Sequence, residues 1–490
     1  MSKLELSVTG IRNLLSQVDS KKSPGPEGVP AYVISTLANE LAPLLLAFFN
    51  KSLDECIVPA SWKKALITPV PKKGRKTKPD DFRPISLTSI FCKILEHIIC
   101  SYLMRFLSAN AAITQSQHGF RKGRSCESQL ALLNHDILQA ADKGFRTDAI
   151  FLDFKKAFDT VPHKKLLQKL ESYGIDSHII RWIESFLTSR CQRVVLDGVI
   201  SDEVNVTSGV PQGSVIGPAL FLIYINDIVD NVKSNIRLFA DDTLIYRKIQ
   251  TAEDHSILQR DLDIISKWCE DWQLGLNVEK CVAMTMTRSP TNSLNISPYQ
   301  ISGVKLDFVN HYKYLGVVFS SDLSFKTHIQ SVVELSDRMT RLCNRILRGS
   351  QSKVKEVAYF SLVRPLLEYC CAVRSPHEKG LTLELERVQR RAACFVKGDY
   401  GFDSSVSEMI KTLGWTSLED RRIEYRLKLF EKFRNGDLYN EIRDIVIPVI
   451  SDRNFRNQTS KELREIIART ESYHRSFFPD SVRRINRIDK

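Results

Sequence analysis

Two adjacent aspartates, Asp241 and Asp242, interrupt a run of residues that otherwise has the composition of a buried β-strand. The segment reads LFADDTLIY over residues 238–246. Two carboxylates about 4 Å apart repel each other by roughly 4 kcal/mol at an effective dielectric constant near 20. The pair must therefore face water at a hairpin turn, where aspartate is common, or be neutralised by bound cations.

A third aspartate follows a second apolar strand. In the segment DAIFLDF (148–154), residues Ala149–Leu152 are continuously apolar; Asp153 follows them, and Asp159 lies nearby. Two divalent cations about 3.5–4 Å apart can hold the attacking and leaving oxygens of a phosphoryl transfer, and Mg²⁺ prefers oxygen ligands. One aspartate from a strand end and two from a neighbouring hairpin would build such a site. A solvated strand end is the alternative for Asp153 taken alone.

The composition restricts the partners and the compartment. A net charge of +13 over 490 residues suits a polyanionic partner, with nucleic acid first and an anionic membrane surface second. The 43% hydrophobic content is that of a globular protein with room for about three domains. The 11 cysteines have no zinc-finger spacing, which predicts reduced thiols and an intracellular location, nuclear or cytoplasmic. The apolar runs 41–49 and 219–225 are too short to cross a membrane.

Hydrophobic periodicity and turn residues predict a mixture of helices and strands. The expected helices cover 1–60 with a break at 21–30, then 89–107, 217–230, 253–273 and most of 325–436. The expected strands lie around Val70 and at 149–152, 281–287 and 312–319, with hairpins over 193–214 and 238–246. Residues 437–490 are polar and basic, and we expect them to pack more loosely.

Several segments, in the same order, resemble the motifs of reverse transcriptases from jockey-related non-LTR (LINE-like) retrotransposons. The central ones are IFLDFKKAFDTV (150–161), SGVPQGSVIGPALFLIYINDI (208–228) and FADDT (239–243). Upstream segments that also resemble this family are PASWKKALITPVPKKG (59–74), DFRPISL (81–87) and QHGFRKGRSC (117–126). Downstream ones are WCEDWQLGLNVEKC (268–281), YKYLGVVFSSDLSFKTHI (312–329), VRPLLEYC (363–370) and LERVQRRAACFV (385–396).

The resemblance implies an α+β right-hand polymerase with fingers, a palm built on an antiparallel sheet, and a helical thumb. The expected boundaries are 1–60 for an N-terminal helical extension, 61–147 for the fingers, 148–325 for the palm, 326–436 for the thumb and 437–490 for a basic C-terminal tail. The implied activity is RNA-directed DNA polymerisation, in which dNTPs are added to a primer 3′-OH. The implied partners are an RNA template and a DNA primer or target, and the implied cofactor is Mg²⁺, with Mn²⁺ as a substitute.

By this resemblance, Asp153 and Asp241 would ligate both metal ions, and Asp242 would assist or orient the primer end. Phe158 would lie beneath the incoming sugar and clash with a 2′-hydroxyl, so that dNTPs are favoured; core packing is the alternative. Gln212 and Gly213 would lie beside the nucleotide and the template base, because glycine allows close backbone approach. A plain turn is the alternative for that loop.

The basic residues have implied roles in holding phosphates. Arg83 and Lys72, or Lys73 in its place, would grip the triphosphate, and Lys280 would approach the leaving pyrophosphate; a solvated surface charge is the alternative for each lysine. The predicted template contacts are Arg121 and Arg124. Arg387 shares a helical face with Arg390 and Arg391, and this face would lie along the duplex unless it is simply solvated.

Two features depart from the family pattern. Residues 1–60 are too few for the endonuclease domain that full-length relatives carry, so we expect none in this chain. Arg374 stands where relatives often have an aromatic residue, which suggests sequence drift or a position of little importance. The alternative function is a catalytically idle remnant that binds nucleic acid. A relative of group II intron maturases or telomerase fits less well, because the segments between 363 and 396 resemble jockey elements.

Overall fold

The computed structural model describes residues 4–72, 77–288, 297–436, 438–448 and 462–488. The chain forms two compact units, each assembled from separate stretches of sequence. Unit 1 contains Met1–Phe120, Asp153–Val232 and Asp263–Asn277. Unit 2 contains Arg121–Leu152, Lys233–Leu262 and Val278–Lys490. The boundary therefore falls directly after the strand that precedes Asp153.

Unit 1 contains a five-stranded sheet. Its strands are β1 (Lys64–Pro71), β2 (Phe82–Leu87), β4 (Arg190–Leu196), β5 (Val199–Ile200) and β6 (Val204–Val206). β1 pairs antiparallel with β2 and parallel with β4, and both β5 and β6 pair with β4. Asp197 and Gly198 both have positive φ between β4 and β5, as expected for a tight Asp-Gly hairpin.

Helices make up the rest of unit 1. They are α1 (Val8–Ser16), α2 (Ala31–Thr36), α3 (Ala38–Asp54), α4 (Ile90–Ala109), α6 (Ala157–Thr160), α7 (His163–Ser172), α8 (Ser177–Leu187) and α9 (Gly217–Ile225). α10 (Ala252–Asp271) contributes residues to both units. α9 is buried on all sides, which accounts for its continuous apolar sequence.

A buried carboxylate holds the beginning of α9. Glu96, on α4, is fully buried, and its Oε2 accepts hydrogen bonds from the backbone N–H groups of Val215 at 2.7 Å and Ile216 at 3.2 Å. The first N–H groups of a helix lack partners within it, and a negative charge is favourable there. Burial nevertheless raises the pKa of Glu96. Glu96 thus fixes the point at which the GVPQGS loop enters α9.

Replacing Glu96 with alanine is expected to destabilise unit 1 by about 2–4 kcal/mol, because two buried N–H groups lose their acceptor. Glu96→Gln keeps an acceptor oxygen and should lose less. Urea unfolding followed by tryptophan fluorescence measures the loss, since four of the five tryptophans lie in unit 1: Trp62, Trp182, Trp268 and Trp272. Equal stabilities of the wild type and Glu96→Ala would contradict this prediction.

A buried lysine joins three helices of unit 1. The Nζ of Lys169, on α7, lies 4.9 Å, 4.6 Å and 3.8 Å from the ring centroids of Tyr224, Trp268 and Trp272. The same nitrogen forms an ion pair with Asp227. Burial lowers the pKa of Lys169 to about 8. Cation–π contacts of a desolvated ammonium are strong, so this residue secures α7 against α9 and the end of α10.

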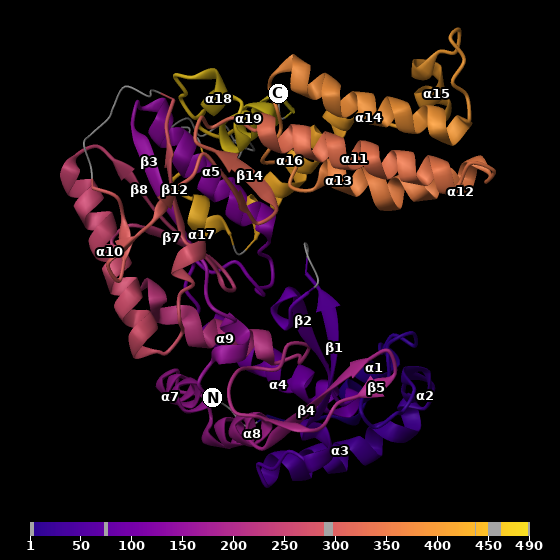
Figure 1. The fold of residues 1–490 in the computed structure, drawn as a ribbon, viewed down its shortest axis with the longest axis vertical. Coiled ribbons are helices and arrows are strands. Elements are labelled where there is room, and N and C mark those ends of the chain that lie inside the picture. The colour runs from indigo at the N-terminus through magenta and orange to yellow at the C-terminus, as the bar shows by residue number, and fades with distance from the viewer. Residues whose placement is uncertain (1–3, 73–76, 289–296, 437, 449–461, 489–490) are drawn as a thin grey trace, which may run out of the picture. The chain divides into compact units, whose positions relative to one another are not determined.

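The main sheet of unit 2 has the order β12-β9-β3-β8-β7. Its strands are β3 (Arg146–Leu152), β7 (Asn235–Phe239), β8 (Asp242–Ile249), β9 (Val282–Met286) and β12 (Asp307–Phe308). The central strand, β3, pairs antiparallel with β8 and β9, and α5 (Cys126–Asp142) packs against the sheet (Figure 1). Two small hairpins accompany it: β10 (Gln300–Ile301) with β11 (Val304–Lys305), and β13 (His311–Tyr314) with β14 (Val317–Ser320).

A helical part of unit 2 follows β14. Its helices are α11 (Lys326–Ile346), α12 (Ser352–Ala358), α13 (Arg364–Glu368), α14 (Lys379–Lys397), α15 (Val406–Thr412) and α16 (Leu418–Asn435). α11 and α14 lie side by side (Figure 1). Ile329, Tyr359, Leu385 and Leu418 belong to the hydrophobic core that joins them.

The C-terminal segment, expected to pack loosely, contains packed helices. They are α17 (Tyr439–Ile442), α18 (Glu471–His474) and α19 (Phe477–Ile488). Phe477, Phe478 and Val482 are buried in the same core as Phe430 of α16. Asp480 also pairs with the buried Arg426. The many charged residues of this segment predicted a solvent-exposed tail. Some of them instead form ion pairs around an apolar face.

Arg374 has a structural role that its place in the sequence did not suggest. Its side chain is fully buried, and the guanidinium donates hydrogen bonds to the carbonyls of Leu367 at 2.8 Å and Tyr369 at 2.7 Å. The last carbonyls of a helix lack partners within it. Arg374 caps the end of α13 in this way, so the position is not unimportant.

The fold class is α+β, as predicted. Helices predominate outside two main sheets, and β3, β7, β8 and β9 pair in antiparallel fashion. Over the part of the chain that the structure describes, no helix combines the length and the apolar character needed to span a bilayer.

Candidate active site

The two adjacent aspartates lie at the turn of the β7–β8 hairpin in unit 2. Phe239 pairs with Asp242, so Ala240 and Asp241 form a two-residue turn. Ala240 has a φ of 54°, a left-handed conformation that costs an alanine about 1 kcal/mol or more. Asp241 is half-buried and Asp242 is exposed. The hairpin thus presents both carboxyl-bearing residues at one end of the sheet.

Asp153 follows the end of the adjacent strand. β3 ends at Leu152, which pairs with Thr243 of β8. The next residue, Asp153, is half-buried, and its carbonyl accepts a hydrogen bond from the N–H of Asn277 at 2.7 Å. The end of the strand that precedes Asp153 therefore lies beside the β7–β8 hairpin in unit 2.

The donor chemistry of the three aspartates fits Mg²⁺, which prefers carboxylate oxygens. Within the described residues, no three His, Cys, Asp or Glu side chains are grouped so that they could hold a metal ion. Asp153 belongs to unit 1, whereas Asp241 and Asp242 belong to unit 2. A shared ion site of all three stays a prediction.

Phe158 is held by two aromatic neighbours in unit 1. It lies on the short helix α6, and its ring stacks on Phe221 of α9 with centroids 4.4 Å apart. The ring of Phe120 meets it edge-on at 6.3 Å. Phe158 is half-buried, and its two aromatic contacts fix the orientation of its ring.

The GVPQGS loop (209–214) forms backbone hydrogen bonds with the region of α6 and with β2. The N–H of Gly209 donates to Val161 O and that of Val210 donates to Phe158 O, both at 2.8 Å. At the other end of the loop, the N–H of Ser86 on β2 donates to Gln212 O at 2.7 Å. These hydrogen bonds tie the loop that carries Gln212 and Gly213 to Phe158 and to β2. The nucleotide-binding roles of the three residues stay predictions.

Gly209→Ala is expected to reduce the DNA synthesis that the resemblance implies by about 100-fold. Gly209 has a φ of 83°, and a Cβ there would lie 2.5 Å from Asp159 O, so the loop and α6 would move apart. A misplacement of about 1 Å can cost about 10² in rate. Gly198→Ala is the matched control, because Gly198 has the same φ with nothing within 4 Å of an added Cβ. Similar primer-extension rates for the two variants would contradict the prediction.

Asp159 is a residue of this site to which the sequence gave no role. Its Oδ1 accepts a hydrogen bond from Gln212 Nε2 at 2.9 Å. Both residues line a cavity of about 340 Å³ in unit 1, together with Lys156, Arg190 and Gly209. Burial raises the pKa of Asp159, while the Gln212 hydrogen bond and the charges of Lys156 and Lys72 oppose that rise. Because Asp159 and Gln212 are 53 residues apart, no local motif signals their contact.

The predicted triphosphate contacts lie around β2. Arg83 is exposed and pairs with Val70 across the β1–β2 ladder. Lys72 is exposed, and its Nζ donates to Asp80 O at 2.9 Å. Lys73, the alternative to Lys72, lies outside the described residues. Lys280 is exposed at the end of the short turn Val278–Lys280 in unit 2.

The two predicted template contacts differ in accessibility. Arg121 is half-buried. The side chain of Arg124 is only 2% exposed and forms an ion pair with Glu441 of α17. A guanidinium that is buried and paired in this way is not presented to a phosphate, so Arg124 has a structural role in place of the predicted template contact.

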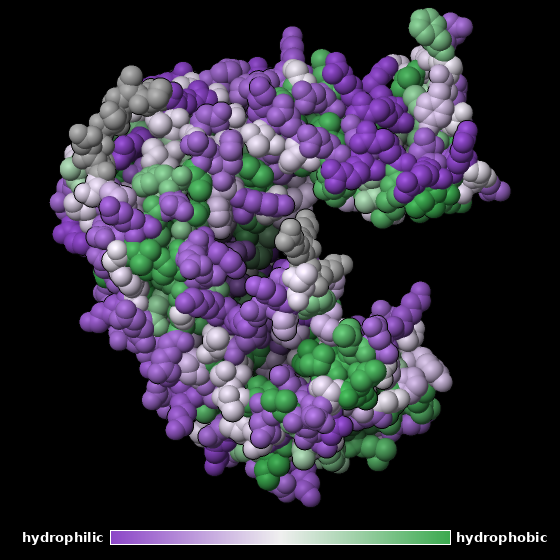
Figure 2. All heavy atoms as spheres, viewed as in Figure 1, coloured by the Kyte–Doolittle hydropathy of each residue, from purple (hydrophilic) through white to green (hydrophobic). Residues whose placement is uncertain are grey.

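Exposed arginines line the helical part of unit 2. Arg387, Arg390 and Arg391 are exposed on α14, and Arg391 forms a two-pronged contact with Asp337 of α11. α11 adds a stripe that sequence reasoning missed: Arg338, Arg341 and Arg345, all exposed. Their spacing of three or four residues places them on one face. Hydrophilic side chains cover much of the visible surface of these helices (Figure 2).

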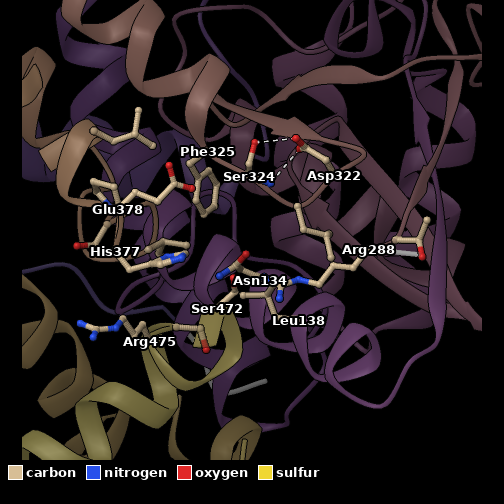
Figure 3. A pocket seen from close by; sticks show the side chains of 17 residues that line it. Asn134, Leu138, Arg288, Asp322, Ser324, Phe325, His377, Glu378, Ser472 and Arg475 are labelled. Atoms are coloured by element: carbon tan, nitrogen blue, oxygen red, sulfur yellow. Dashed lines mark hydrogen bonds between the residues drawn. The ribbon is translucent and has the colours of Figure 1, made fainter. Parts of the chain in front are cut away.

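A second cavity, of about 330 Å³, lies within unit 2. Its lining includes charged residues of both signs, among them Arg288, Asp322, Glu378 and Arg475 (Figure 3). Asp322 accepts hydrogen bonds from the N–H and the hydroxyl of Ser324. The sequence-predicted site residues are not among the described residues that line it, so this cavity is separate from the candidate site.

Comparison with known proteins adds independent information. Residues 70–319 match the family described as "Reverse transcriptase (RNA-dependent DNA polymerase)". The "RNA-directed DNA polymerase from mobile element jockey" of Drosophila melanogaster is 31% identical over 376 residues, covering 73% of this chain and 40% of that protein. The "Probable RNA-directed DNA polymerase from transposon BS" of the same organism is 28% identical over 406 residues, covering 79% of this chain and 44% of that protein. The chain thus spans less than half the length of these relatives.

Proposed function

Because this chain belongs to the reverse transcriptase (RNA-dependent DNA polymerase) family, we propose that it is an RNA-directed DNA polymerase of a jockey-like non-LTR retrotransposon. It adds dNTPs to the 3′-OH of a primer paired with an RNA template. One observation carries the proposal: β3 ends at Leu152, opposite Thr243 of β8, and β8 begins at Asp242, directly after the turn residue Asp241. This register supports Asp153, Asp241 and Asp242 as the acidic set of the site.

In the proposed reaction, the primer 3′-oxygen bonds to the α-phosphorus of the dNTP, and the bond to the leaving pyrophosphate breaks. Two Mg²⁺ ions, when bound, neutralise the charge on the attacking and leaving oxygens. The three aspartates would hold these ions, and Mn²⁺ would substitute for Mg²⁺. The repulsion between Asp241 and Asp242 is tolerated because the proposed cations offset it.

The nucleotide lies against residues of unit 1. Phe158 provides a rigid wall beneath the sugar. Gln212 and Gly213 lie beside the nucleotide, because the loop that carries them is hydrogen-bonded to the region of α6 and to β2. Arg83 and Lys72 contact the triphosphate, for which a guanidinium and an ammonium are suitable partners. For Lys280, which belongs to unit 2, the resemblance implies an approach to the leaving pyrophosphate.

The template–primer duplex is held through its phosphates. Arg121, Arg387 and Arg391 make these contacts, and the arginine stripe of α11 extends them. Each phosphate that is neutralised contributes about 0.9 to the slope of log affinity against log salt on a duplex. We therefore expect binding that is independent of sequence and steeply dependent on salt. Under this proposal, the helices from α11 to α16 act as the thumb.

Primer extension tests the proposed function directly. Purified protein is given a DNA primer on an RNA template with dNTPs and Mg²⁺, and full-length DNA is expected. EDTA should stop synthesis, and excess Mg²⁺ should restore it. No extension over a range of Mg²⁺, Mn²⁺ and salt concentrations would overturn the enzymatic proposal.

The second candidate function is that of a catalytically idle remnant that binds nucleic acid. The exposed arginines of α11 and α14 would bind phosphates equally well in such a protein. Filter binding separates the two functions. Salt-sensitive RNA binding with no extension would favour the remnant, and extension that depends on the acidic set would exclude it.

A further inference from the structure

The contact between Asp159 and Gln212 restricts what Gln212 can offer to a ligand. Gln212 Nε2 lies 2.9 Å from Asp159 Oδ1. An ionised carboxylate only accepts hydrogen bonds, whereas a glutamine amide has a donor end and an acceptor end. The carboxylate therefore engages the NH₂ group and leaves the amide oxygen for another partner.

We propose that Asp159 is a positioning residue, which orients the Gln212 amide so that its oxygen accepts a hydrogen bond from a donor group of the bound nucleotide. This rests on the proposed function, because it deepens the role of the same site. The recognised group is a hydroxyl or an N–H of the nucleotide, not its phosphates. Asp159 itself need not touch the nucleotide.

The backbone around Asp159 is held as tightly as its side chain. Asp159 O accepts a hydrogen bond from Ser208 Oγ at 3.0 Å. The neighbouring Phe158 O and Val161 O accept from Val210 and Gly209. The backbone of residues 158–161 is therefore fixed to residues 208–210 by three hydrogen bonds. Because the backbone of Asp159 is fixed, its carboxylate can hold the Gln212 amide in one orientation. A mobile carboxylate would instead follow the movements of the amide.

The surroundings of Asp159 add a dependence on pH. Burial raises the pKa of Asp159, Lys156 and Lys72 oppose this rise, and Arg190 lines the same cavity. Once protonated, the Asp159 carboxyl can donate a hydrogen bond to the Gln212 amide oxygen, so the amide can flip. Nucleotide affinity is therefore expected to fall as the pH drops through the raised pKa of Asp159. Asp159→Asn should abolish this dependence.

A double-mutant cycle tests the proposal through the KM for dNTP in primer extension. Asp159→Asn is expected to raise KM about tenfold in the wild-type background, with a much smaller change in kcat. In the Gln212→Ala background, the same change should have no further effect, because interacting residues are not additive. A purely structural Asp159 would raise KM equally in both backgrounds, and that result would overturn the proposal.

A second measurement needs no activity. Protein labelled with ¹⁵N in its glutamine side chains gives an amide signal for Gln212, which the Gln212→Ala variant identifies by its absence. We expect this signal to shift in Asp159→Asn, while the thermal unfolding temperature stays within a few degrees. An unchanged signal would overturn the positioning role. A shifted signal in a protein that extends no primer would instead overturn the proposed function, so the two failures are distinguishable.

Discussion

Replacing Asp241 with asparagine is expected to lower the rate of RNA-templated DNA synthesis by about 10³-fold or more. Asp241 is the half-buried member of the pair at the β7–β8 turn, and under the proposed function it ligates both ions. A metal ion that stabilises transition-state charge contributes several kcal/mol, and each 1.36 kcal/mol is a factor of about ten in rate. The loss should appear in kcat, because the chemical step is affected and not nucleotide binding.

The same substitution is expected to leave the fold as stable as before, or more stable. Without bound ions, Asp241→Asn removes the repulsion between two adjacent carboxylates, and proteins often give up stability at such sites for function. Single-turnover extension measures the rate, and a thermal unfolding scan in EDTA measures the stability. Filter binding of RNA should be unchanged, because the arginines of α11 and α14 are intact.

Asp202→Asn is the matched control for Asp241→Asn. Asp202 is an exposed aspartate between β5 and β6 in unit 1, and losing its charge should alter neither synthesis nor stability. The assignment of the acidic set is wrong if Asp241→Asn and Asp202→Asn extend primers at the same rate. An Asp241 variant that has unfolded would contradict the stability prediction.

Phe158→Val is expected to produce the second-largest effect, a loss of about 100-fold in the preference for dNTPs over rNTPs. The proposed role of the ring is to occupy the space that a 2′-hydroxyl would need. Changes in the size of a pocket alter discrimination by about 10–200-fold. Because the ring is stacked on Phe221 and held edge-on by Phe120, it cannot turn aside at low cost. Valine opens that space.

The measurement is the ratio of kcat/KM for a dNTP to that for the matching rNTP. Phe48→Val is the matched control: Phe48 is a partly exposed ring of unit 1 with an edge-on aromatic partner, Trp62, at 5.4 Å. Both variants lose an aromatic contact, so both should lose about 1–2 kcal/mol of stability, but only Phe158→Val should accept rNTPs. Unaltered discrimination in a folded Phe158→Val variant would leave core packing as the role of this ring.

The expectations that the structure matched rest on local patterns. The apolar run before Asp153 became the central strand β3, and Asp241 and Asp242 lie at the turn of an antiparallel hairpin. The continuous apolar stretch after the GVPQGS loop became the buried helix α9. Alternation, apolar runs and turn residues are properties of neighbouring positions, so they can be recognised in the sequence alone.

Other features depend on residues that are distant in the sequence. Glu96 caps the start of α9 from 119 residues away, and Asp159 orients Gln212 across 53 residues. Arg124 looked like a template contact in a basic loop, yet it is buried against Glu441. In the C-terminal segment, Phe477 and Phe478 join the core of α16 although the segment is rich in charge. Such pairings follow from which surfaces meet, and charge or periodicity alone does not specify them.

The sequence by itself determined the family, the α+β class and the order of strands and turns that carry the acidic residues, because these are encoded by local periodicity and by motifs in a fixed order. Only the tertiary structure decided which charged side chains are solvent-exposed and which hold the loops in place. The reason is physical: the cost of burying a charge or a polar group depends on its partners, and those partners come from remote parts of the chain.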